Sequence, residues 1–197
     1  MSRIQVLKNP ILNYTWGSHT AISGLLGNPI PSIEPEAELW MGAHPKASSM
    51  ININGSWISL NEAISRNPEA ILGTKVSIHF HHNLPFLFKV LAAEKPLSIQ
   101  AHPDKIQAVK GFERENREKI PLDSPIRNYR DPNHKPELLC ALSPFWALCG
   151  FRKIDETISL IEKAGIRDLN EEVGQLSRRP DSHGMNGFIS HLMALDA

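Results

Sequence analysis

Proline is the residue type that most restricts the folds open to this chain. The 197 residues include 15 prolines, most of them in loops between apolar segments. Proline lacks the backbone N–H that helices and inner strands use, so each one ends or interrupts an element. We therefore expect many short elements rather than a simple helical bundle. A content of 41% hydrophobic residues is enough for a core.

Charge and cysteine content narrow the range of partners and compartments. The 21 basic and 21 acidic residues balance, and no basic stripe indicates nucleic-acid binding. We find no signal peptide and no apolar stretch long enough to cross a membrane. Cys140 and Cys149 stand in apolar runs without a CxxC motif, which predicts buried, reduced thiols. We expect a cytoplasmic protein whose partner is a small molecule or a protein, not nucleic acid or membrane.

The first half of the chain predicts short strands and helices. Strand segments are expected within residues 4–15, 36–45, 49–53, 84–93 and 97–102. The Asn54-Gly55 pair between apolar residues predicts a hairpin turn. Residues 19–36 are rich in Gly and Pro and are expected to form a loop. A capping box from Ser59 to Glu62 predicts a helix over 60–66, and Pro68 begins another short one.

The second half changes in character near residue 152. A helix with one solvated, charged face is expected over residues 104–119. Two apolar strands are expected over residues 138–142 and 145–151. After residue 152 only helices are expected, the first of them capped by Asp155 and closed by Gly165.

Three histidines close together suggest a metal site at first sight. Residues 76–82 show a strand pattern that includes His79, His81 and His82. On a strand, His79 and His81 share one face and His82 takes the other. Zinc sites need three or four convergent ligands, so the pattern argues against a metal site here.

Polar residues on neighbouring predicted strands form a second candidate site. Ser98, Gln100 and His102 alternate with apolar residues, so on a strand their side chains would share a face. Such a row is either a ligand site or a solvated strand face. Lys89 lies in the preceding apolar strand, where it either reaches solvent or meets an anion. Glu137 opens a later strand, and Gln, His and Glu together form a donor set that suits zinc.

Five segments carry a resemblance to a known family. They are, in order, residues 14–18 (YTWGS), 38–45 (ELWMGAHP), 84–91 (LPFLFKVL), 100–105 (QAHPDK) and 134–138 (HKPEL). In these segments the chain resembles the type I mannose-6-phosphate isomerases. The resemblance runs from the first strand to about residue 152, and the helical stretch that follows resembles the inserted helical region of that family.

The resemblance implies a fold, a reaction and a set of roles. The fold would be mixed and mainly β: an incomplete cupin-type β-barrel (jelly roll) over residues 1–152, then the start of an inserted helical domain over residues 153–197. The reaction would be the zinc-dependent interconversion of mannose 6-phosphate and fructose 6-phosphate through a cis-enediol. The zinc ligands would be Gln100, His102 and Glu137. The sugar phosphate would be bound by Trp16, Lys89 and Ser98. Proton transfer would belong to Lys135 or His134.

The sequence also departs from the family pattern. Family members are longer, and their later strands carry a fourth zinc ligand, a histidine, and a catalytic arginine. We therefore expect one zinc ion per chain with three ligands from this sequence, a truncated chain, and the missing C-terminal half as a partner. The alternative is a non-catalytic, cupin-like module that binds zinc or a sugar phosphate.

Overall fold

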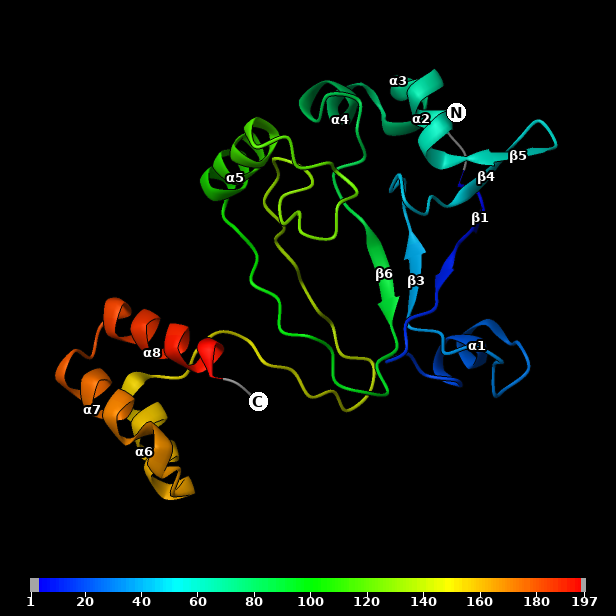
Figure 1. The fold of residues 1–197 in the computed structure, drawn as a ribbon. Coiled ribbons are helices and arrows are strands. Elements are labelled where there is room, and N and C mark those ends of the chain that lie inside the picture. The colour runs from blue at the N-terminus through cyan, green and yellow to red at the C-terminus, as the bar shows by residue number, and fades with distance from the viewer. Residues whose placement is uncertain (1–3, 196–197) are drawn as a thin grey trace. The chain divides into compact units, whose positions relative to one another are not determined.

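The computed structural model describes residues 4–195, drawn in Figure 1. The chain forms two compact units that divide between Gln100 and Ala101.

The first sheet of the N-terminal unit is a three-stranded antiparallel sheet. It consists of β1 (Leu7–Lys8), β4 (Met50–Ile53) and β5 (Ser56–Ser59) in the order β1-β4-β5. The predicted hairpin joins β4 to β5, with Asn54 at φ 53° and Gly55 at φ 89°. Positive φ at both positions is what a tight hairpin turn of the right twist requires. Asn52 adds an Oδ1 acceptor for the Gly55 N–H at 2.9 Å.

The second sheet positions several candidate site residues. It consists of β2 (Ile11–Leu12), β3 (Glu38–Met41) and β6 (Phe88–Leu91) in the order β2-β3-β6, with both pairs antiparallel. The register places Trp40 opposite Lys89. A short helix, α1 (Ala21–Leu26), contributes the fully buried Ile22 to the core of this sheet. The expected loop over residues 19–36 therefore contains a helix, which Gly27 ends in a left-handed conformation.

Three helices follow the first sheet along the chain. The predicted helices α2 (Leu60–Arg66) and α3 (Pro68–Leu72) are both confirmed. The third, α4 (Thr74–His79), replaces the strand expected over residues 76–82. The alternating apolar residues do not form a buried face, because Ile78 is 65% exposed, and Ser77 is buried instead. The strand prediction was therefore wrong.

The second unit begins with a well-capped helix. The expected helix over residues 104–119 is present as α5 (Lys105–Arg117). The Asp104 side chain accepts from the Gln107 N–H at 2.7 Å, and Gln107 Oε1 accepts from the Asp104 N–H at 3.2 Å. This reciprocal capping box satisfies backbone donors that the helix itself leaves unpaired.

Three predicted strands are absent from the described residues. Residues 97–101, 138–142 and 145–151 pair with no other backbone segment in the described part of the chain. A strand needs a hydrogen-bonded neighbour, and an apolar pattern alone does not supply one. The apolar side chains are correspondingly open, with Leu138 98% and Trp146 97% exposed. Cys140 and Cys149 are free thiols, but they are exposed, so the prediction that they are buried was wrong.

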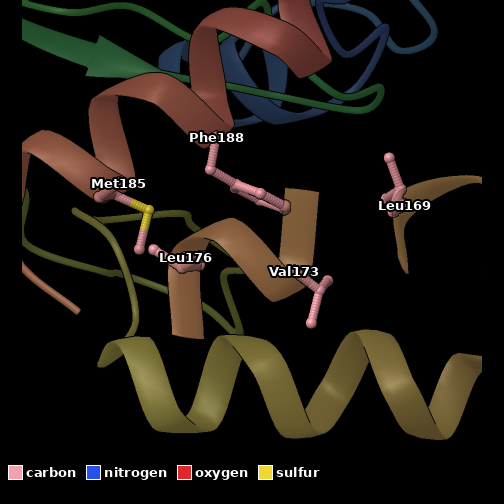
Figure 2. Packing of buried hydrophobic residues seen from close by; sticks show 5 residues of the cluster. All are labelled: Leu169, Val173, Leu176, Met185 and Phe188. Carbon is pink, nitrogen blue, oxygen red and sulfur yellow. The ribbon is translucent and has the colours of Figure 1, made fainter. Parts of the chain in front are cut away.

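The C-terminal helices share a core of their own. They are α6 (Ile154–Ala164), the 3-10 helix η1 (Arg167–Leu169), α7 (Asn170–Arg178) and α8 (Ser182–Ala194). The first helix has Lys153 as its N-cap, so the expected cap at Asp155 was wrong, whereas its expected closing residue Gly165 is the C-cap, at φ 67°. Figure 2 shows the shared core cluster, formed by Leu169, Val173, Leu176, Met185 and Phe188. The domain boundary expected near residue 152 stays a prediction.

The fold class is mixed, as expected, but helices hold more of the described residues than strands do. The expectation of a mainly β chain rested partly on the three segments that lack a strand partner. Among residues 4–195, no helix is both long enough and apolar enough to cross a membrane.

Candidate metal centre and its surroundings

The second unit brings His102 and Glu137 together. The distance from His102 Nε2 to Glu137 Oε2 is 3.2 Å. The two side chains are 28% and 51% exposed, so both remain open to solvent. His102 lies two residues before Asp104, the N-cap of α5, and the capping box therefore fixes the backbone close to the imidazole. An imidazole nitrogen and a carboxylate oxygen this close can share either a proton or a cation.

Gln100 and Ser98 belong to the first unit, in the segment that lacks a strand partner. Both side chains are exposed. The structure thus does not support the predicted strand face shared by Ser98, Gln100 and His102.

His134 and Lys135 lie in an exposed segment of the second unit. Just before them, the ammonium of Lys105 donates to the backbone carbonyl of Pro132 at 2.9 Å and to Asn133 Oδ1 at 3.0 Å. These bonds connect the start of α5 to the segment that carries the predicted proton-transfer residues. Sequence reasoning missed Lys105, although it stands in one of the five segments that carry the family resemblance.

His102 and Glu137 form a pair and are not part of a larger cluster in the described part of the chain. Within residues 4–195, no three His, Cys, Asp or Glu residues converge to hold a metal ion. One of the three histidines near the end of α4 is hydrogen-bonded to that helix. His82 Nδ1 lies 2.6 Å from the buried hydroxyl of Ser77.

Lys89 on β6 meets an anion on the neighbouring strand. Its ammonium lies 3.3 Å from Oε1 of Glu38, whose other oxygen accepts from the Trp40 indole N–H at 2.6 Å. Glu38 is buried, whereas the Lys89 side chain is 35% exposed. Of the two environments that we considered for Lys89, the structure supports the one with an anion. The sequence signal for Glu38 was an acidic residue within an otherwise apolar strand.

The backbone at Trp16 and Gly17 lies close to the backbones of residues 94–95 and 36–37. The Trp16 carbonyl accepts hydrogen bonds from the N–H groups of Glu94 and Lys95 at 2.9 and 3.2 Å. Its ring stacks on Tyr14 with centroids 5.6 Å apart. A Cβ atom on Gly17 would lie 2.6 Å from the backbone nitrogen of Ala37, so only glycine fits beside Trp16.

A buried charge network holds the loop after α5 against that helix. Arg127 donates to the backbone carbonyls of Ile120 and Tyr129 and to Asn116 Oδ1. The Glu115 carboxylate accepts from the backbone N–H groups of Asn128 and Tyr129. Burial alone would raise the Glu115 pKa, but these hydrogen bonds and the Arg127 charge outweigh it and lower the pKa below its ordinary value. Sequence reasoning missed this network because it took the charges of α5 for a solvated face.

The chain is similar to known proteins over almost its whole length. Residues 4–154 match the family model for the catalytic domain of type I phosphomannose isomerase. Mannose-6-phosphate isomerase of Salmonella typhimurium is 52% identical over 191 residues, which cover 96% of this chain and 48% of that protein. The human enzyme of the same name is 42% identical over 170 residues, covering 82% and 38%. The chain spans about half the length of the Salmonella relative and less of the human one.

Solved structures give the same result. The Salmonella typhimurium enzyme, bound to fructose 6-phosphate and zinc, matches with a TM-score of 0.88 and 44% identity. The match covers 98% of this chain and 48% of that one. Other structures of the Salmonella enzyme carry a single replaced lysine, histidine or glutamate.

Proposed function

This chain belongs to the type I phosphomannose isomerase family, and on that premise we propose that it acts as a zinc-dependent aldose–ketose isomerase. The substrates would be mannose 6-phosphate and fructose 6-phosphate. The ligands of one zinc ion from this chain would be Gln100, His102 and Glu137. The relatives that bear the enzyme's name, and the solved structure with zinc and fructose 6-phosphate, support this proposal.

One observation carries the metal assignment: the 3.2 Å separation of His102 Nε2 and Glu137 Oε2. Two atoms that bind a tetrahedral zinc ion, each about 2.1 Å from it, lie about 3.4 Å apart. The two donor atoms thus have a spacing that fits one ion, and both side chains are exposed enough to receive it. Gln100 would add an amide oxygen, and this N/O donor set suits zinc.

The replaced residues of the Salmonella enzyme support the same assignment. The interval from its replaced histidine to its replaced glutamate equals the 35 residues that separate His102 from Glu137. The interval from its replaced lysine to that histidine equals the interval from Lys89 to His102. Lys89, His102 and Glu137, which residue type and sequence pattern mark as candidates, thus have the same spacing as three residues that were replaced in a relative.

The proposed reaction moves a proton between C1 and C2 of the sugar. A base must accept the proton, and a donor must return it to the neighbouring carbon of the cis-enediol. His134 and Lys135 are the proposed proton carriers, and both are exposed in the segment that leads to Glu137. Zinc, when bound, would polarise the sugar oxygens on which charge develops. Lys89 and Ser98 would bind the phosphate-bearing substrate, with Trp16 as an aromatic wall.

The proposal extends to the domain organisation. Residues 1–152 would contribute strands to a cupin-type β-barrel, and residues 153–197 would belong to an inserted helical region. The high structural similarity to phosphomannose isomerases supports the family fold. In this arrangement the segments over residues 97–101 and 138–151, which have no strand partner in the described part of the chain, would be barrel strands.

A coupled assay tests the proposed function. The purified, zinc-loaded protein is given mannose 6-phosphate, and fructose 6-phosphate is followed through phosphoglucose isomerase and glucose-6-phosphate dehydrogenase. We expect turnover that His102→Ala abolishes and that His183→Ala, in the C-terminal helices, leaves unchanged. Absence of turnover from folded, zinc-loaded protein would contradict the isomerase proposal.

One observation favours a second function, a non-catalytic module that binds zinc or a sugar phosphate. Within residues 4–195, no third His, Cys, Asp or Glu joins His102 and Glu137. Calorimetric titration with zinc and with fructose 6-phosphate separates the two functions. Binding without turnover would support the module, and binding with turnover would exclude it.

A further inference from the structure

We propose that Lys105 is a positioning residue, which holds the segment carrying His134, Lys135 and Glu137 against the start of α5 so that Glu137 stands beside His102. The inference rests on the proposed function, because it concerns how that zinc site is assembled. Lys105 itself contacts neither of the proposed ligand side chains in the second unit.

The position of Lys105 is fixed by the start of α5. It is the first residue of α5, directly after the N-cap Asp104. The capping box between Asp104 and Gln107 holds the backbone here at both ends of the first turn. The Lys105 backbone and the nearby His102 are therefore anchored to the same helix start.

Lys105 forms two hydrogen bonds with residues that lie far from it in the sequence. Its ammonium donates to the Pro132 carbonyl at 2.9 Å and to Asn133 Oδ1 at 3.0 Å. Asn133 is itself held in a tight turn, because its N–H donates to Asp131 Oδ1 at 2.8 Å. An ammonium that binds oxygens of two adjacent residues restrains both the direction of that segment and its distance from the lysine.

Few other hydrogen bonds restrain the segment that carries His134, Lys135 and Glu137. Over the described residues 134–151, the hydrogen bond between His102 Nε2 and Glu137 Oε2 is the one that reaches another part of the chain. Lys105 therefore supplies the last anchor before Glu137. Upstream, the network of Glu115 and Arg127 holds the chain as far as Tyr129.

Loop-closure entropy gives the size of the effect. With Lys105 in place, about four flexible residues separate the anchor from Glu137, and without it about eight separate Tyr129 from Glu137. Doubling a loop weakens the closed state about threefold. If the upstream network also opens, the loop approaches the 35 residues that separate His102 from Glu137, and the loss relative to the wild type rises to about 25-fold.

The experiment compares Lys105→Met, Lys105→Arg and Lys110→Met with the wild-type 197-residue chain. Lys110 is an exposed lysine on the same helix and serves as the matched control. Zinc affinity is measured by competition with a chromophoric chelator. Backbone order over residues 133–137 is measured without metal by the ¹⁵N heteronuclear NOE.

We expect Lys105→Met to weaken zinc binding about three- to 25-fold and to lower the NOE over residues 133–137. Lys105→Arg should restore both, because its guanidinium can also donate to two acceptors. Lys110→Met should change neither. Wild-type zinc affinity and wild-type backbone order in Lys105→Met would overturn the inference.

The two readouts keep this inference separate from the proposed function. If the wild-type chain binds no zinc, the zinc assignment of the proposed function fails. The NOE of the metal-free protein then decides alone whether Lys105 positions the segment.

Discussion

Nε2 of His102 lies 3.2 Å from Oε2 of Glu137, although 35 residues of chain separate them. An exposed pair of this kind contributes about 1 kcal/mol or less to stability, so the fold gains little from bringing the two together. An imidazole and a carboxylate that meet at an open surface are instead well suited to share a metal ion. The contact is thus more informative about function than about folding.

Glu38 is expected to stabilise the first unit through its two partners. Glu38→Ala removes the acceptor of the buried Trp40 indole N–H and the counter-charge of Lys89. The lost acceptor should lower the free energy of unfolding by about 1–3 kcal/mol. Glu38→Gln should cost less, because its amide oxygen can still accept from the indole. Urea denaturation measures both, with the exposed Glu34→Ala as control, and equal stability of Glu38→Ala and the control would contradict this role.

Gly17→Ala is expected to disturb the neighbourhood of Trp16. The added Cβ would lie 2.6 Å from the Ala37 backbone nitrogen and 2.7 Å from the Glu36 carbonyl carbon, and neither backbone atom can move freely. We expect a loss of about 1–3 kcal/mol in unfolding free energy and a shifted tryptophan fluorescence maximum. Gly24→Ala, where no atom lies within 4 Å of the added Cβ, is the control and should be neutral or slightly stabilising. Thermal unfolding that is unchanged in Gly17→Ala would show that the two backbones separate easily.

The parts of the fold that could be predicted from the sequence were those determined by local signals. The helix over residues 60–66, the Asn54-Gly55 hairpin and the start of a helix near residue 104 each depend on a few adjacent residues. Predictions that depended on distant partners failed or stayed untested. The alternation at Ile99 and His102 indicates an extended backbone, but it cannot say whether another strand lies beside it.

The candidate site shows the same division. Lys89, His102 and Glu137 stood out because polar residues are unusual next to apolar strand patterns. Glu38, the partner of Lys89, and Lys105, which binds Pro132 and Asn133 just before His134, were missed because these contacts join residues far apart in the sequence. Residue type indicated the proposed chemistry, whereas the positioning contacts required the structure.

Acid is expected to weaken the network that holds the loop after α5. The Glu115 pKa is lowered in the folded chain from the ordinary value of 4.5. Its stabilising effect is therefore fully present above pH 4.5 and is lost as the pH falls through the folded pKa. Thermal unfolding between pH 7 and pH 3 should show a steep acid decline in the wild type.

Glu115→Gln should be less stable than the wild type at pH 7 and should decline less steeply below pH 4.5. Its glutamine cannot ionise, and it leaves the buried Arg127 without its counter-charge. Glu113→Gln, an exposed position on the same helix, is the control. The same acid slope in Glu115→Gln and the wild type would contradict the assignment.

Zinc binding by the purified chain tests the central claim most directly. Metal content after dialysis is measured by elemental analysis for the wild type, His102→Ala and Glu137→Ala, with circular dichroism to confirm that each is folded. His79→Ala is the control, since that histidine lies at the end of α4. The account predicts about one zinc ion in the wild type and the control, and a large loss in both His102→Ala and Glu137→Ala. Zinc retained by both ligand variants, or absent from the folded wild type, would contradict it.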